Sequence, residues 1–133
     1  MKSFSLKIVT PEGARFDGEA ESILFRTTDG DVEILAGHSD LYGAIGTGRV
    51  RIIQGGNSKF ASASGGVFSI KGGVAKLVCV TFEFKEDIDL ERANLAKEKA
   101  EERIARAKSD RELDLAKAKL QRALSRINVA TNK

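Results

Sequence analysis

The sequence contains no tryptophan and a single residue each of cysteine, proline, histidine, tyrosine and methionine among its 133 residues. With one cysteine there can be no disulfide within the chain, and with one histidine no cluster of Cys and His has metal-ligand spacing. Cys79 lies in the apolar run Leu77–Val80, which favours a buried, reduced thiol over a nucleophile. His38 lies on a glycine-flanked loop near Asp40, where a structural or interface role is favoured over a catalytic one. We therefore predict no metal site and no catalytic residue.

Other absences remove further classes of protein. No apolar run approaches the roughly 20 residues that a membrane-spanning helix needs, and the first residues lack the apolar core of a signal peptide. The glycines of 43–48 lack the Lys-Ser/Thr of a phosphate loop, and 64–66 lacks the pattern of a nucleophile elbow. These absences predict an intracellular chain that is not itself an enzyme and carries no catalytic cofactor.

Charge is unevenly distributed along the chain. Residues 1–88 carry 10 basic and 11 acidic side chains, whereas residues 89–133 carry 12 and 8, and no acid follows Asp114. A basic terminal segment favours an anionic partner, which can be a nucleic acid, a nucleotide or an acidic protein surface. The alternative is a solvated helix face with no partner.

Two structural units meet in the junction 86–93. Before it, short β-branched and aromatic runs alternate with turn residues, and Gly55–Ser58 and Lys71–Gly73 are typical of β-hairpins. After it, glycine and proline disappear, and Ala, Leu, Lys, Arg and Glu recur with helical spacing. The predicted class is α+β, with an antiparallel β-sandwich or flattened barrel over 1–87 and an antiparallel two-helix hairpin over 88–133.

The helices are predicted at about 90–107 and 110–129. Ser109 and Glu112 form the pattern of a capping box, so a new helix begins there and 107–109 forms the bend. One face of the first helix carries mainly alanine: Ala93, Ala96, Ala100, Ile104 and Ala107. One face of the second helix combines alanine with larger apolar residues: Leu113, Ala116, Leu120, Ala123 and Ile127. Alanine buries little area, so we expect stable helices whose mutual docking is marginal, as a conformational switch requires.

Basic side chains gather at one end of this predicted hairpin. Arg122 and Arg126 are four residues apart and share a helix face. In an antiparallel hairpin bent near residue 108, Arg92 lies roughly level with them. Three guanidinium groups repel one another unless an anion bridges them, and their planar forks suit phosphate. The alternative is that all three point into solvent.

Several segments, in this order and spacing, resemble the epsilon subunit of bacterial and plastid F-type ATP synthases over essentially the full chain. The segments are Pro11–Gly13, Gly30–Asp31 through Ala36–His38, Gly48–Ile52, Ser64–Val67 and Ile88–Ala93. The resemblance implies a non-catalytic rotor subunit whose β-sandwich contacts the gamma subunit and the c-ring, with Asp31 and His38 as rotor contacts. It also implies peripheral attachment at the cytoplasmic face of a bacterial plasma membrane.

In that family the helical hairpin either extends into the alpha/beta catalytic head and blocks ATP hydrolysis, or folds down and permits turnover. Some members bind ATP as an allosteric ligand in the folded form through Ile/Leu-Asp-x-x-Arg-Ala, which Ile88–Ala93 matches. The resemblance thus implies an ATP site in which Glu83, Ile88 and Asp89 contact the nucleobase side. Arg92, Arg122 and Arg126 would contact phosphate, and Ala93 completes the motif.

The chain departs from the family pattern at two places. The segment 30–40 lacks a second glycine and both prolines that the family commonly has, and Lys99 stands where ATP-binding relatives can carry arginine. A lysine keeps the charge but loses the planar fork. The alternative function is a nucleic-acid-binding β-barrel with a basic helical tail, against which stands the scarcity of aromatic residues for base stacking.

Overall fold

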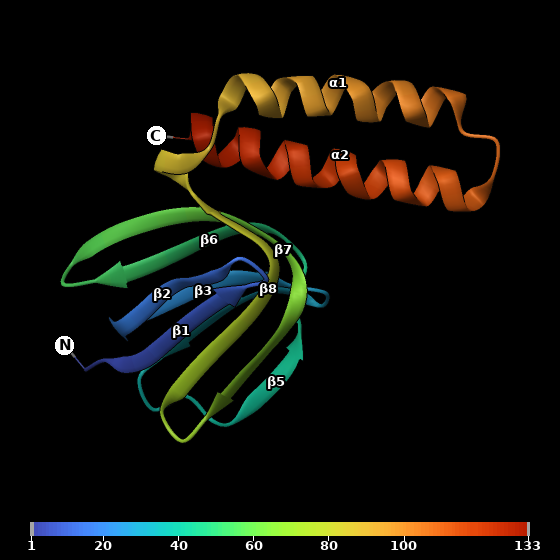
Figure 1. Ribbon diagram of the computed structural model, residues 1–133. Helices are drawn as coiled ribbons and strands as arrows, with labels where there is room; N and C mark the ends of the chain where they lie inside the picture. Colours follow the sequence, from blue (N-terminus) through green and yellow to red (C-terminus); the bar gives the residue numbers. More distant parts are fainter. Residues whose placement is uncertain (1, 133) are drawn as a thin grey trace.

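The computed structural model describes residues 2–132 and contains an eight-stranded sheet followed by a pair of α-helices (Figure 1). The strands are β1 (Phe4–Thr10), β2 (Gly13–Ala20), β3 (Ser22–Thr27), β4 (Gly30–Leu35), β5 (Leu41–Ala44), β6 (Thr47–Gln54), β7 (Asn57–Lys71) and β8 (Val74–Phe84). A short 3-10 helix, η1 (Lys85–Asp87), leads into α1 (Leu90–Arg106) and α2 (Asp110–Thr131). The predicted α+β class is confirmed; Met1 and Lys133, the ends of the two predicted units, lie outside the described residues.

The sheet has the order β2-β1-β8-β7-β6-β3-β4, with β5 paired to β7, so its two ends do not close into a barrel. The two hairpins expected from sequence are the β6–β7 and β7–β8 pairs, and their turns contain Gly55–Gly56 and Gly72–Gly73 with positive φ. All strand pairs are antiparallel except β1 and β8, which run parallel. This parallel pair brings the turn after β1 to the end of β8 from which the helices begin.

Two strands have no clear signal in the sequence. The edge strand β2 is mostly exposed and contains two glycines, and β5 is a short exposed strand of 4 residues. Neither buries the alternate residues that produce a recognisable period-2 pattern. In addition, the runs 59–62 and 67–70, which glycines separate in the sequence, are parts of one continuous strand, β7.

Strand β7 remains continuous because glycine occupies its bend. Gly65 and Gly66 have φ of +72° and +114°, and a Cβ on Gly66 would lie 1.9 Å from the carbonyl oxygen of Val78. Opposite this bend, burial along β8 changes phase, from alternate positions through Cys79 to Phe82. The bend therefore lets the long strands β7 and β8 curve, and the sheet folds over a shared core (Figure 1).

The core of the sheet is apolar and closely packed. Ile8, Ile23 and Leu77 are fully buried, and the rings of Phe25 and Phe68 meet edge to face with centroids 4.9 Å apart. Cys79 is a free cysteine within this core, and burial raises the pKa of its thiol to about 11. The expected burial of the Cys79 thiol is confirmed.

Side-chain caps fix the start of both helices. Asp89 accepts a hydrogen bond from the Arg92 amide at 3.0 Å, and Ser109 Oγ accepts one from the Glu112 amide at 3.1 Å. Glu112 in turn accepts from the amide of Lys108 at 2.9 Å, one residue before the position expected for a capping box. The chain therefore turns sharply between the helices, and they lie side by side (Figure 1).

The seam between the helices consists mainly of alanine. The fully buried residues on facing sides are Ala93 and Ala100 of α1 and Ala116 and Ala123 of α2. Such small side chains remove little apolar area from water, at about 25 cal/mol per Å². By contrast, Leu95, Leu115 and Leu124 are 52%, 55% and 40% exposed. These three leucines of the hairpin thus lie at the surface.

Replacing Gly66 with alanine is expected to destabilise the β domain by more than about 3 kcal/mol, because the new Cβ would collide with backbone. Gly18→Ala is the matched control: its φ is not positive, and a Cβ there would lie 3.6 Å from its nearest neighbour, the side-chain nitrogen of Gln54. The control should therefore cost less than about 1 kcal/mol. Urea unfolding followed by circular dichroism measures both. Equal losses in the two variants would contradict the role given to the bend.

Candidate functional site

Helix α2 attaches the hairpin to the sheet, and α1 lies on its far side (Figure 1). Ser125 Oγ lies 2.7 Å from Ser62 Oγ on β7, and Val129 is buried to 1% exposure. The Arg126 guanidinium forms an ion pair with Glu83 near the end of β8, and Lys85 donates to the carbonyl of Asn132. Three polar contacts therefore join α2 and the residue after it to β7, β8 and η1.

A cleft of about 430 Å³ opens where the sheet, the junction and both helices meet. We name it the junction cleft. Its lining residues are Glu12, Arg15, Thr81, Phe82, Glu83, Asp87, Asp89, Arg92, Ala93, Ala96 and Arg126. These residues come from the β1–β2 turn, β2, β8, η1 and the start of α1, and α2 contributes Arg126, so the docking of α2 brings a guanidinium into the cleft.

Most of the residues predicted for an ATP site lie in or beside this cleft. Its lining includes Glu83, Asp89, Arg92, Ala93 and Arg126. Arg122 lines the adjoining cleft together with Lys99, and Arg126 lines both clefts. The structure therefore brings the three predicted arginines to one region.

Ile88 is the predicted residue that lines neither cleft. It is half-buried and follows η1, where its amide donates to the carbonyl of Lys85 at 3.3 Å. Ile88 therefore lies in the junction between the sheet and α1, where its amide closes the turn that η1 forms.

The two carboxylates of the predicted nucleobase side already have partners within the chain. Asp89 caps α1, and Glu83 pairs with Arg126, whose side chain is 29% exposed. Arg92, in contrast, forms no ion pair among residues 2–132. An anionic ligand entering the junction cleft would thus meet Arg92 directly and would compete with Glu83 for Arg126.

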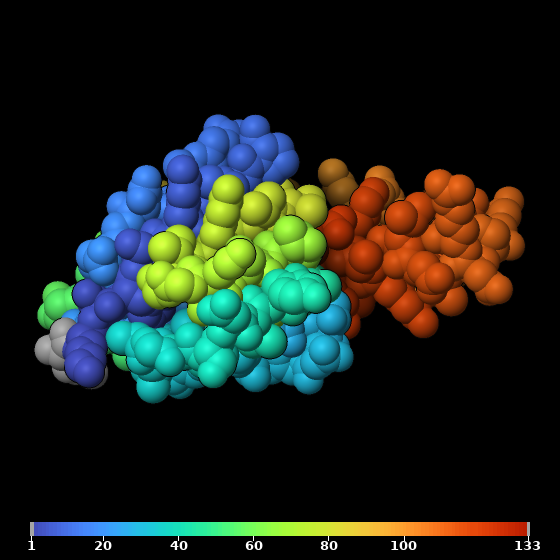
Figure 2. All heavy atoms as spheres, turned by 90° about the horizontal axis from the view of Figure 1, so that it is seen from below, coloured from blue at the N-terminus to red at the C-terminus, as the bar shows by residue number. Residues whose placement is uncertain are grey.

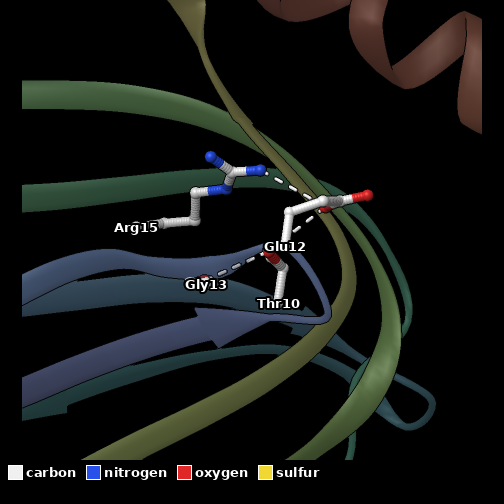
Figure 3. Close-up of polar contacts among 4 residues, drawn as sticks. All are labelled: Thr10, Glu12, Gly13 and Arg15. Carbon is white, nitrogen blue, oxygen red and sulfur yellow. Dashed lines mark hydrogen bonds and ion pairs between the residues drawn. The ribbon is translucent and has the colours of Figure 1, made fainter.

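The junction cleft also contains residues that the sequence analysis did not select. Glu12 on the β1–β2 turn and Arg15 near the start of β2 form an ion pair of 3.3 Å, and Thr10 closes the turn with a hydrogen bond to the Gly13 carbonyl (Figure 3). The parallel pairing of β1 with β8 places this turn at the cleft. No local sequence pattern signals that pairing, although proline and glycine at Pro11–Gly13 are typical of a turn.

The residues predicted as rotor contacts lie at opposite ends of β4. Asp31 pairs with Arg26 at 2.6 Å and raises the pKa of that guanidinium, mainly through their hydrogen bond. His38 follows the strand, and its Nδ1 lies 2.6 Å from the carbonyl of Ser39. Asp40 accepts from the amide of Gly72 at 3.3 Å, which ties this loop to the β7–β8 turn. The structure therefore does not bring Asp31 and His38 together.

Within residues 2–132, neither helix has the length and apolar character that crossing a membrane requires.

Comparison with protein families matches both parts of the chain. Residues 3–85 match the beta-sandwich domain of the ATP synthase delta/epsilon chain, and residues 86–131 match the long alpha-helix domain of the same chain. The chain belongs to the ATP synthase delta/epsilon family. The resemblance inferred from Pro11–Gly13, Ile88–Ala93 and the segments between them is therefore confirmed.

Curated relatives agree over the whole length. The ATP synthase epsilon chain of Caldicellulosiruptor bescii is 36% identical over 98% of this chain and 95% of its own length. The ATP synthase epsilon chain of Bacillus velezensis is 35% identical over 99% of this chain and all of its own length. Epsilon chains are non-catalytic subunits of the rotary enzyme, so membership of this family confirms that the chain is not itself an enzyme.

Solved structures share the fold. A chain in a cryo-electron microscopy structure of the Euglena gracilis mitochondrial ATP synthase, comprising OSCP, F1 and the c-ring, superposes with a TM-score of 0.80 at 21% identity. That comparison covers 92% of this chain and 78% of the other. A chain from the central stalk and c-ring of the Tetrahymena thermophila enzyme gives a TM-score of 0.68 at 13% identity, over 98% of both chains.

The Glu83–Arg126 pair is expected to contribute a coupling energy of about 0.5–1 kcal/mol, because both side chains are about one-third exposed to water. A double-mutant cycle with Glu83→Gln and Arg126→Gln measures it through the urea unfolding of the full chain. Hydrogen exchange should show faster exchange in α2 of each single variant, while the β core stays protected. A coupling energy of zero would remove the ion pair from the docking contacts.

Proposed function

We propose that the chain is a central-stalk subunit that couples the catalytic head of the ATP synthase to its c-ring and restrains ATP hydrolysis through its helical hairpin. ATP is the allosteric ligand that favours the compact hairpin. The observation that carries the proposal is the junction cleft itself, because its lining combines the ATP motif at the start of α1 with Glu83 of β8 and Arg126 of α2. A ligand held by all three elements stabilises only the docked form.

The energy scale suits such control. A ligand that binds only the docked form, at about 100 times its dissociation constant, stabilises that form by about 2.7 kcal/mol. The alanine seam and the polar contacts of α2 are weak enough for an energy of this size to shift the equilibrium.

The exposed leucines support a second position for the hairpin. Leu95, Leu115 and Leu124 lie at the surface, although removing each of these side chains from water would lower the free energy. In the proposed extended form they pack against the gamma subunit and the alpha/beta head, and basic residues of α2 meet an acidic segment of the catalytic beta subunit. The helices themselves stay intact, since their caps and propensities are local.

The outer face of the sheet offers a surface for the rotor. Tyr42, Val67, Val78 and Val80 are 85%, 58%, 40% and 60% exposed on the adjacent strands β5, β7 and β8. In Figure 2 the cyan and yellow-green atoms of this region lie side by side on the face toward the viewer. We assign this face to the gamma subunit and retain Asp31 and His38 as contacts to the rotor. The site of action is the cytoplasmic face of a bacterial plasma membrane, where the chain is bound peripherally.

Titration of the full chain with ATP by calorimetry tests the ligand. We expect saturable binding that Arg92→Ala weakens at least about tenfold, because this arginine has no competing carboxylate among residues 2–132. Arg111→Ala, which removes an exposed charge outside the clefts, should change the affinity less than about fivefold. Absence of binding to the parent chain would remove ATP as the ligand and leave the stalk role in place.

Deletion of 89–133 tests the inhibitory role. In the reassembled enzyme the truncated chain is expected to support proton coupling at the parent level while ATP hydrolysis rises several-fold, because the blocking element is gone. ATP-driven proton pumping and steady-state hydrolysis measure the two effects. Unchanged hydrolysis in a correctly assembled enzyme would refute inhibition by the hairpin.

A further inference from the structure

Three clefts form a continuous groove along the hairpin. The junction cleft shares Ala96 and Arg126 with a neighbouring cleft of about 270 Å³ between α1 and α2. That second cleft shares Lys99, Arg103 and Lys119 with a third, of about 490 Å³, nearer the turn between the helices. The groove therefore runs from the sheet almost to the far end of the hairpin.

The charge of this groove is concentrated in its middle. The second cleft is lined by five cationic side chains and two alanines, with no carboxylate: Ala96, Lys99, Ala100, Arg103, Lys119, Arg122 and Arg126. The lining of the third cleft also includes Arg106 and two carboxylates, those of Glu102 and Glu112. Among residues 2–132, Arg126 is the only one of the five cations that forms an ion pair. Five cations around one cleft that no carboxylate lines favour a bound polyanion.

We propose that the groove binds a linear polyphosphate chain longer than that of a nucleoside triphosphate, with Arg103 and Lys119 holding the phosphates beyond those of ATP. The proposal rests on the proposed function, because the ATP site sets where the first phosphates lie. What it adds is that the bound chain extends from there toward the turn between the helices. An inorganic polyphosphate and a nucleoside tetraphosphate share this chemistry.

The length of the groove supports this choice of ligand. From Arg92 to Arg103 the helix advances by 11 residues, roughly 16 Å at 1.5 Å per residue. A triphosphate group is shorter than this row of cations, so it would leave Arg103 and Lys119 without an anion. A longer chain would reach them without any change in the helices.

The lining also argues against a nucleic acid. The second and third clefts contain no aromatic side chain on which bases could stack. Arginine and lysine side chains suit phosphate oxygens, and the guanidinium of Arg103 can contact two of them at once.

The test measures binding of four probes to the full chain by calorimetry: ATP, adenosine 5′-tetraphosphate, inorganic polyphosphate and a single-stranded RNA oligonucleotide. The variant is the double substitution Arg103→Gln/Lys119→Gln. Its matched control is Arg111→Gln/Lys117→Gln, which removes the same charge from exposed positions outside the groove. Circular dichroism verifies that both variants keep their helices.

We expect the groove variant to bind inorganic polyphosphate at least about tenfold more weakly than the parent chain does. It should also bind the tetraphosphate no more tightly than ATP. The affinity of the groove variant for ATP should change less than about fivefold, and so should the affinity of the control variant for every probe. If ATP fails to bind while polyphosphate shows this pattern, the nucleotide proposal falls and the present one stands. The polyphosphate proposal would be overturned if both variants lost the same affinity for polyphosphate, or if the parent chain did not bind polyphosphate. It would also be overturned if RNA bound and the groove variant weakened its binding to the same extent.

Discussion

The docking of α2 on the sheet is the interaction on which the functional features of this chain depend. It includes the Ser62–Ser125 hydrogen bond, the Glu83–Arg126 ion pair and the contact of Lys85 with Asn132. Helix α2 in turn packs on α1 through a seam whose fully buried side chains are alanines. Each contact is modest, because polar pairs that remain partly exposed contribute little. The junction cleft has Arg126 beside Arg92 only while this docking holds. In the proposed function, this weak interface decides whether the hairpin is compact and can hold a ligand or is extended.

Local sequence patterns were sufficient for the parts of the fold that local interactions determine. The glycine turns of two β-hairpins, the caps at Asp89 and Ser109 and the alanine faces follow from neighbouring residues alone. Nonlocal features were not accessible in this way. The parallel pairing of β1 with β8, the exposed edge strand β2 and the bend that keeps β7 continuous depend on packing between distant segments. In the sequence, a glycine pair between two strand-like runs is as consistent with a break between two strands as with a bend in one strand.

The same division applies to the candidate site. Arg122 and Arg126 share a face because they are one helical turn apart, and the hairpin then brings them to the level of Arg92. Glu12 and Arg15 were missed because only the sheet topology carries their turn to the cleft. The carboxylates of Glu83 and Asp89 are occupied by Arg126 and by a helix amide, which sequence spacing could not reveal. The proposed ligand would therefore compete with contacts that also hold the docked form together.

A reversible disulfide across the docking interface tests the central claim most directly. The hydroxyl oxygens of Ser62 and Ser125 are 2.7 Å apart, so Ser62→Cys/Ser125→Cys can form a bond with little backbone movement. Cys79 should not interfere, because burial raises its pKa to about 11. In the assembled enzyme, oxidation should lock the hairpin down and raise ATP hydrolysis, and reduction should restore inhibition. Hydrolysis that is unchanged or lower after complete oxidation would contradict the account.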